Sequence, residues 1–73
     1  MSALPENVRK LLVIFKQAIE SEKGAQAAYA EARDLCDDPM LKAILEGFRK
    51  DEERHERELK IRYAKIRGDM DKA

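Results

Sequence analysis

The sequence predicts an all-α protein, an antiparallel two-helix hairpin that dimerises into a four-helix bundle. Three observations indicate this fold. A strong turn signal, Asp37-Asp38-Pro39, lies near the middle of the 73 residues, and good helix formers fill both flanks. Apolar residues recur at intervals of three and four along each flank. The composition, 44% hydrophobic and 41% charged, suits helices with one apolar and one solvated face.

The first helix is expected over residues 5–36. Pro5 suits the first turn of a helix, because its φ is fixed and an N–H at that position would have no partner. From Pro5 to Cys36, Gly24 is the one residue that interrupts a run of good helix formers. The segment therefore reads as one long helix.

A turn is expected at residues 37–38. Asp38 can accept hydrogen bonds from the free N–H groups at the start of a following helix, and Pro39 fits the first position of that helix. At 1.5 Å per residue the two helices are about 48 and 43 Å long. A two-residue link between helices of matched length predicts an antiparallel hairpin.

The second helix is expected over residues 39–67. Gly68 is predicted to adopt the left-handed conformation that often closes a helix. Basic residues in the preceding turns favour a helix end at Arg67. Residues 68–73 are expected to form a frayed tail.

The size and charge of the chain exclude several classes of protein. A single domain of 73 residues has a small core and usually needs a disulfide, a metal or a partner subunit. Cys36 is the one cysteine, which excludes an intrachain disulfide and favours a cytoplasmic location. Basic and acidic side chains balance at 15 each, which argues against nucleic-acid binding. The longest strongly apolar run, Leu11–Phe15, is too short for a membrane span.

Each helix carries an apolar stripe that ionisable residues interrupt. The stripe of the first helix consists of Val8, Leu12, Phe15, Ile19, Glu22, Gln26, Tyr29, Arg33 and Cys36, flanked by Leu11, Ala18, Ala25 and Ala32. The stripe of the second helix consists of Leu41, Leu45, Phe48, Glu52, His55, Leu59, Tyr63 and Ile66. An uncompensated carboxylate within such a stripe is costly. Glu22, Glu52 and His55 therefore require an explanation.

These three residues are expected at one height along the hairpin. At 1.5 Å per residue, Glu22, Glu52 and His55 lie about 23, 22 and 26 Å from the turn. The i,i+3 spacing puts Glu52 and His55 on one helix face, and Glu22 can meet them across the hairpin. Two carboxylates and one imidazole without a thiolate suit iron or manganese, with zinc as a competitor. The sequence thus predicts a three-ligand metal half-site.

A single hairpin leaves part of its apolar surface bare. Leu11–Phe15 is apolar nearly all the way round, so something beyond the partner helix has to bury it. Two hairpins related by a two-fold axis form a four-helix bundle and bring together two copies of each metal-ligand candidate. We therefore expect a homodimer whose subunits share a site of four glutamates and two histidines.

Four sequence features together resemble the ferritin-like and rubrerythrin superfamily. They are Glu22, Tyr29 seven positions later, the Asp-Pro-x-Leu turn at residues 38–41, and the Glu-x-x-His motif of Glu52 and His55. The resemblance covers about residues 18–62. It is closest to the encapsulated ferritins, in which two one-hairpin subunits together form a ferroxidase centre.

The resemblance implies an enzyme, a ferroxidase that oxidises Fe(II) to Fe(III) with oxygen. Glu22, Glu52 and His55 would bind two irons per dimer, and Tyr29 would act near the metals as a further catalytic residue. The implied partners are a second copy of the chain, a higher ring such as a decamer, and an encapsulin nanocompartment that stores the iron.

The chain departs from that family at three places. Acidic residues that family members carry on the iron access route correspond here to Ser21 and Gly24, so we expect Glu20 to take their role. Ala28 replaces an aromatic residue. The shell-docking tail of the family has no counterpart in this sequence, so the implied encapsulation stays open.

Simpler explanations of the same residues remain open at this point. Glu52 and His55 can instead form surface ion pairs with Arg49, Lys50 or Arg54, and Glu22 can pair with Lys23 or Gln26. Tyr29 can be a core residue. For the whole chain, the alternatives are a rubrerythrin-like peroxide reductase, which would need an external electron donor, and a metal-free helical dimerisation module.

Overall fold

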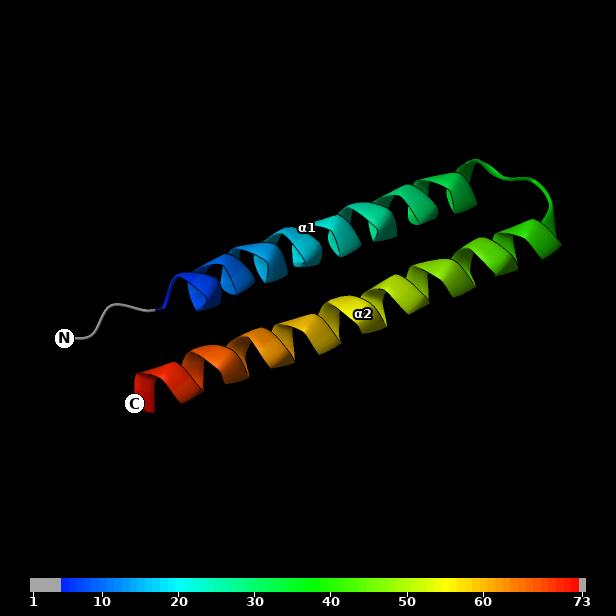
Figure 1. The fold of residues 1–73 in the computed structure, drawn as a ribbon. Coiled ribbons are helices and arrows are strands. Elements are labelled where there is room, and N and C mark those ends of the chain that lie inside the picture. Colours follow the sequence, from blue (N-terminus) through cyan, green and yellow to red (C-terminus); the bar gives the residue numbers. More distant parts are fainter. Residues whose placement is uncertain (1–4, 73) are drawn as a thin grey trace.

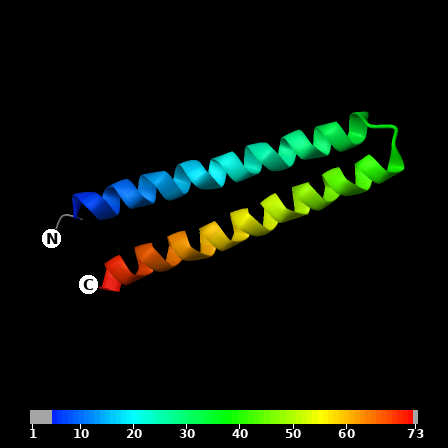
Figure 2. The same cartoon turned by 45° about the vertical axis from the view of Figure 1, so that its right-hand side comes forward.

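The structure is a computed structural model that describes residues 5–72, and it has two helices and no strand over that range. Helix α1 spans Glu6–Leu35 and helix α2 spans Pro39–Lys72. The helices run side by side in opposite directions, so the start of α1 and the end of α2 lie together, away from the turn (Figures 1 and 2). The predicted all-helical hairpin is confirmed.

The boundaries of α1 differ by one residue at each end from the predicted range 5–36. Pro5 lies just before the helix, and its carbonyl accepts hydrogen bonds from the N–H groups of Val8 and Arg9, both at 3.1 Å. At the other end, Cys36 has an extended backbone and its N–H donates to the carbonyl of Arg33 at 3.3 Å. The turn therefore spans residues 36–38.

The start of α2 follows the predicted capping pattern. The N–H of Met40 donates to Asp38 Oδ1 at 3.0 Å, and the N–H of Lys42 donates to the Asp38 carbonyl at 2.9 Å. Pro39 occupies the first helical position, where its missing N–H leaves no bond unmade. These contacts fix the direction in which α2 leaves the turn.

The predicted end of the second helix at Arg67 is wrong, because α2 continues through Gly68 to Lys72. Gly68 does not take the left-handed conformation, since no glycine of the described residues has a positive φ. A glycine inside a helix costs only about 1 kcal/mol relative to alanine, so it permits a helix end without enforcing one. Of the predicted frayed tail, residues 68–72 are helical and Ala73 lies outside the described residues.

Charged side chains connect the helices near the turn. Arg33 Nη1 of α1 lies 2.5 Å from Glu46 Oε1 of α2. Arg49 donates to both oxygens of the same carboxylate at 2.8 Å and to Glu53 at 2.9 Å. The hydrogen bonds from Arg49, and next the one from Arg33, lower the pKa of Glu46 from 4.5 to about 2.

The shifted pKa of Glu46 predicts an acid-sensitive hairpin. Because the pKa is lower in the folded chain, the ionised carboxylate stabilises the fold above pH 4.5, and that stabilisation disappears as the pH falls toward about 2. We expect the urea midpoint, followed by circular dichroism, to fall across this interval. In Glu46→Gln that part of the pH dependence should be missing; an equal fall in both proteins would contradict the assignment.

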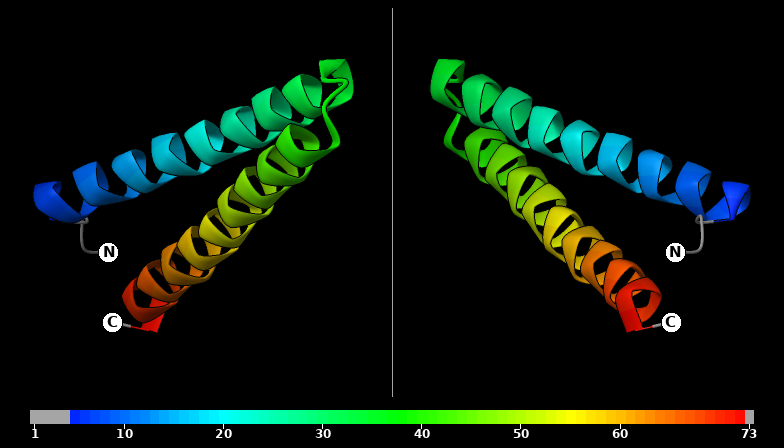
Figure 3. Two further views of the ribbon diagram at one scale, coloured as in Figure 1. Left: turned by 90° about the vertical axis from the view of Figure 1, so that its right-hand side faces the viewer. Right: turned by 90° about the vertical axis from the view of Figure 1, so that its left-hand side faces the viewer.

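The hairpin has almost no interior. Ile19, at 8% exposure, is the one buried apolar residue in the described part of the chain. No third element covers either flank of the helix pair there, as the side views show (Figure 3). The large apolar residues left exposed are Leu11, Val13, Ile14, Leu35, Met40, Leu41, Ile44, Phe48 and Ile61. Neither described helix contains a stretch long and apolar enough to cross a lipid bilayer.

Candidate metal centre

Glu22, Glu52 and His55 meet across the middle of the hairpin, and we call them the ligand cluster. Each offers one ligand atom, and these atoms all lie within 4.8 Å of one another. His55 Nδ1 lies 3.5 Å from Glu22 Oε2 and 3.8 Å from Glu52 Oε2. The arrangement follows from helix geometry, because Glu52 and His55 are one turn apart on α2 and the antiparallel α1 presents Glu22 at the same height. The structure therefore brings together the three residues that the sequence singled out.

The burial of the ligand cluster is uneven. The side chains of Glu22 and Glu52 are 23% and 22% exposed, whereas that of His55 is 44% exposed. Glu22 Oε2 is fully shielded from solvent and has no hydrogen-bond partner among the described residues. Its 3.5 Å separation from His55 Nδ1 exceeds the usual N–H···O range of about 2.7–3.2 Å. A shielded carboxylate oxygen without a donor is unfavourable, and a cation bound at this point would satisfy it.

The neighbours that could neutralise Glu22 have other partners. Lys23 lies 3.5 Å from Glu20, and Gln26 donates to Glu56 of the opposite helix at 2.6 Å. The alternative in which Glu22 pairs with Lys23 or Gln26 is therefore wrong. Among the described residues, the group that faces the Glu22 carboxylate is therefore the imidazole of His55.

The surface ion-pair alternative for Glu52 and His55 fails in the same way. Arg49 holds the carboxylates of Glu46 and Glu53, and Arg54 lies 4.0 Å from Asp51. Within the described chain, Arg49, Lys50 and Arg54 form no ion pair with Glu52. The ligand cluster thus consists of two carboxylates and one imidazole, with no described arginine or lysine at ion-pair distance.

A groove of about 400 Å³ opens beside the ligand cluster. It is lined by Glu22, His55, Glu58, Leu59 and Arg62. Arg62 Nη1 donates to the carbonyl of Glu58 at 3.3 Å. The sequence did not single out Arg62 as part of the site, although its position seven residues after His55 puts it on the same helix face.

Tyr29 lies against Phe48 rather than within the ligand cluster. The two ring centroids are 5.5 Å apart, with the planes inclined by 51°. No hydrogen bond joins the Tyr29 hydroxyl to the ligand cluster in the described part of the chain. This contact accounts for Tyr29 as a packing residue, and its catalytic role stays a prediction.

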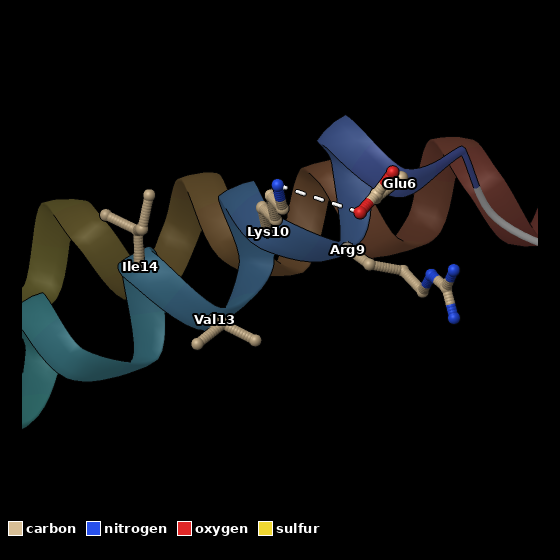
Figure 4. A pocket seen from close by; sticks show the side chains of 5 residues that line it. All are labelled: Glu6, Arg9, Lys10, Val13 and Ile14. Carbon is tan, nitrogen blue, oxygen red and sulfur yellow. Dashed lines mark ion pairs between the residues drawn. The ribbon is translucent and has the colours of Figure 1, made fainter.

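A second groove lies at the start of α1, away from the ligand cluster. Glu6, Arg9, Lys10, Val13 and Ile14 line it, and the Lys10 ammonium lies 3.6 Å from Glu6. Val13 and Ile14 leave the helix in different directions (Figure 4) and are 53% and 59% exposed. Within the hairpin, this end of α1 is therefore apolar on more than one side, as its sequence predicted.

The donor set of the ligand cluster matches metals that accept oxygen and imidazole nitrogen. Carboxylates and histidine without a thiolate suit iron and manganese, and zinc binds the same groups. Three donors leave further coordination positions open. His55, at 44% exposure, is the member of the cluster that solvent reaches most easily. No family model, curated protein or solved structure matches this chain.

Proposed function

We propose that the protein is a ferroxidase, which oxidises Fe(II) to Fe(III) with oxygen at a di-iron centre formed between two copies of the chain. The observation that carries the proposal is the ligand cluster itself, with three ligand atoms within 4.8 Å of one another. The shielded and unpartnered Glu22 Oε2 supports it further, because a cation is the group that such an oxygen lacks.

The exposed apolar surface supports the second copy. Ile44, Phe48 and His55 lie within about 40° of one another around α2, at 3.6 residues per turn. Ile44 and Phe48 are 46% and 47% exposed. Since His55 also faces Glu22 of α1, Ile44, Phe48 and the ligand cluster share one face of the hairpin. A second hairpin on that face would bury Ile44 and Phe48 and reach the open side of the proposed metal ligands.

The ligand count fits this arrangement. One hairpin supplies two carboxylates and one imidazole, which is too few for a pair of iron ions. Two hairpins supply four carboxylates and two imidazoles, the set that ferritin-like helical bundles use for two iron ions. The dimer would thereby provide both a core and a complete site.

The chemistry of the side chains suits iron oxidation. Two Fe(II) ions each give one electron to oxygen, which takes up two protons and becomes hydrogen peroxide. Glu22 and Glu52 would hold the ferrous substrate and offset the added positive charge of the ferric product. His55 would bind as the neutral imidazole and orient the site.

Storage of the product requires a container outside the hairpin. The groove beside the ligand cluster and the groove at the start of α1 hold only about 400 Å³ each, which is too little space for a mineral. We propose an encapsulin shell as that container. A ring of dimers, such as a decamer, would cover Val13 and Ile14 at the end of α1.

Anaerobic titration with Fe(II), followed by exposure to air, tests this function. We expect two iron ions bound per dimer, then oxygen uptake at about one molecule per two irons, as the two-electron reduction of oxygen requires. Faster oxidation by peroxide than by oxygen would favour a peroxide reductase. Dimers that bind no iron would identify a metal-free dimerisation module and exclude the ferroxidase.

A further inference from the structure

A hydrogen bond between Gln26 and Glu56 joins α1 to α2 beside the ligand cluster. Gln26 Nε2 donates to Glu56 Oε1 at 2.6 Å. Gln26 lies one turn after Glu22 on α1, and Glu56 directly follows His55 on α2. Among the described residues, it is one of two side-chain hydrogen bonds that cross between the helices, and the other lies near the turn.

The Gln26–Glu56 bond passes the level of the ligand cluster. At 1.5 Å per residue, Gln26 lies about 17 Å from the turn and Glu56 about 28 Å. The metal ligands lie between these heights, at about 22–26 Å. The bond therefore runs diagonally past the cluster and connects the turn of α1 next to Glu22 with the turn of α2 that carries His55.

Glu56 is held in place by two donors. Its Oε1 accepts from Gln26 at 2.6 Å, and its Oε2 lies 2.5 Å from Lys60 Nζ. The side chain is only 15% exposed. It lines a groove with Glu53, Arg57 and Lys60, which is separate from the groove that Glu22 and His55 line. Both oxygens of Glu56 are thus occupied, and this carboxylate is a fixed anchor for Gln26 rather than a further metal ligand.

We propose that Gln26 and Glu56 are positioning residues, whose hydrogen bond sets the separation of α1 and α2 where Glu22 meets Glu52 and His55. The inference rests on the proposed function insofar as the ligand of the cluster is a divalent cation. Metal ligands on two different helices bind well only if the helices keep a fixed distance and rotation. Apolar contacts between the helices are non-directional, whereas the Gln26–Glu56 hydrogen bond is directional and fixes both the distance and the rotation of the helices.

The variant Gln26→Met tests the positioning role with Co(II) as the probe. It keeps the length of the side chain and the helix propensity but removes the donor. Groups that hydrogen-bond directly to a metal ligand typically contribute about 10–100-fold to metal affinity. Because Gln26 acts through the spacing of the helices, we expect the low end of this range, a weakening of Co(II) binding by about tenfold in calorimetry. The Co(II) absorption spectrum should also change in intensity, since it reports ligand geometry.

The matched control is Gln17→Met. Gln17 lies on the exposed surface of the same helix, so the control makes the same chemical change away from the cluster. We expect its Co(II) affinity and spectrum to equal those of the unmodified protein. An equal loss in both variants would overturn the positioning role, as would an unchanged affinity in Gln26→Met.

Exchanging the two residues tests whether the bond itself matters. In the double variant Gln26→Glu, Glu56→Gln, the new amide can donate to the new carboxylate and still accept from Lys60, with no change in net charge. We expect this double variant to restore Co(II) affinity and spectrum toward those of the unmodified protein. Failure of the exchange to improve on Gln26→Met would contradict the proposal.

A metal-free measurement separates this inference from the proposed function. In the apo protein, we expect nuclear Overhauser contacts between the Glu22 side chain and the His55 ring, and we expect Gln26→Met to weaken them. A chain that binds no Co(II) but shows this loss refutes the metal site and retains the positioning role. Normal contacts in Gln26→Met refute the positioning role alone.

Discussion

Replacing Glu52 by alanine is expected to abolish Fe(II) oxidation while leaving the hairpin helical. The change removes one ligand from each subunit and therefore two of the four carboxylates of the proposed dimeric site. Glu52 Oε2 lies 3.8 Å from His55 Nδ1, beyond hydrogen-bond range, so the loss of this contact should not unfold the chain. Oxygen consumption with Fe(II) measures the first effect, and far-ultraviolet circular dichroism measures the second.

The adjacent Glu53→Ala is the matched control for this experiment. It removes the same charge one residue away, but Glu53 is 48% exposed and interacts with Arg49 and Arg57. Its loss should leave iron oxidation close to that of the unmodified protein. Wild-type oxidation by Glu52→Ala would exclude Glu52 as a ligand. An equal loss of oxidation in both variants would show that a loss of negative surface charge, and not of a ligand, causes the effect.

The hairpin was predictable because its signals are local. Asp38 and Pro39 act within one turn of helix, through a side-chain oxygen and a missing N–H, and the structure contains both features. The far end of α2 was not predictable in this way. Gly68 allows two backbone conformations at a small difference in free energy, and nothing adjacent in the sequence selects one of them.

The position of the ligand cluster was predictable because each helical residue adds 1.5 Å, so residue numbers give the height of each side chain along the hairpin. The hydrogen-bond partners of individual side chains were not predictable. By sequence spacing, Gln26 lies one turn from Glu22 and could donate a hydrogen bond to it. In the structure Gln26 instead donates to Glu56 of the opposite helix. That choice depends on how α1 and α2 are rotated against each other, which spacing along a single helix does not determine.

The exposed apolar face of Ile44 and Phe48 gives the second large expected effect, because Phe48→Glu should convert the proposed dimer to monomers. Phe48 is 47% exposed at the edge of the helix pair, one turn before Glu52. Burying the rest of such a ring contributes about 1.5 kcal/mol. A two-fold interface contains two copies of this ring and would lose the contribution of both. Burying the new carboxylates would cost further free energy. We expect the dimer dissociation constant to rise at least about a hundredfold, measured by analytical ultracentrifugation.

Ile61→Glu distinguishes loss of the interface from a general effect of added charge. Ile61 is 62% exposed, and at 3.6 residues per turn it lies about 100–140° around α2 from Ile44, Phe48 and His55. This variant should remain dimeric and bind two irons per dimer. Phe48→Glu should lose both the partner hairpin and tight binding of two irons, because the separated hairpin keeps only three of the six proposed metal ligands. Monomers of Phe48→Glu that still bind and oxidise iron normally would show that one hairpin suffices, and the shared site would have to be abandoned.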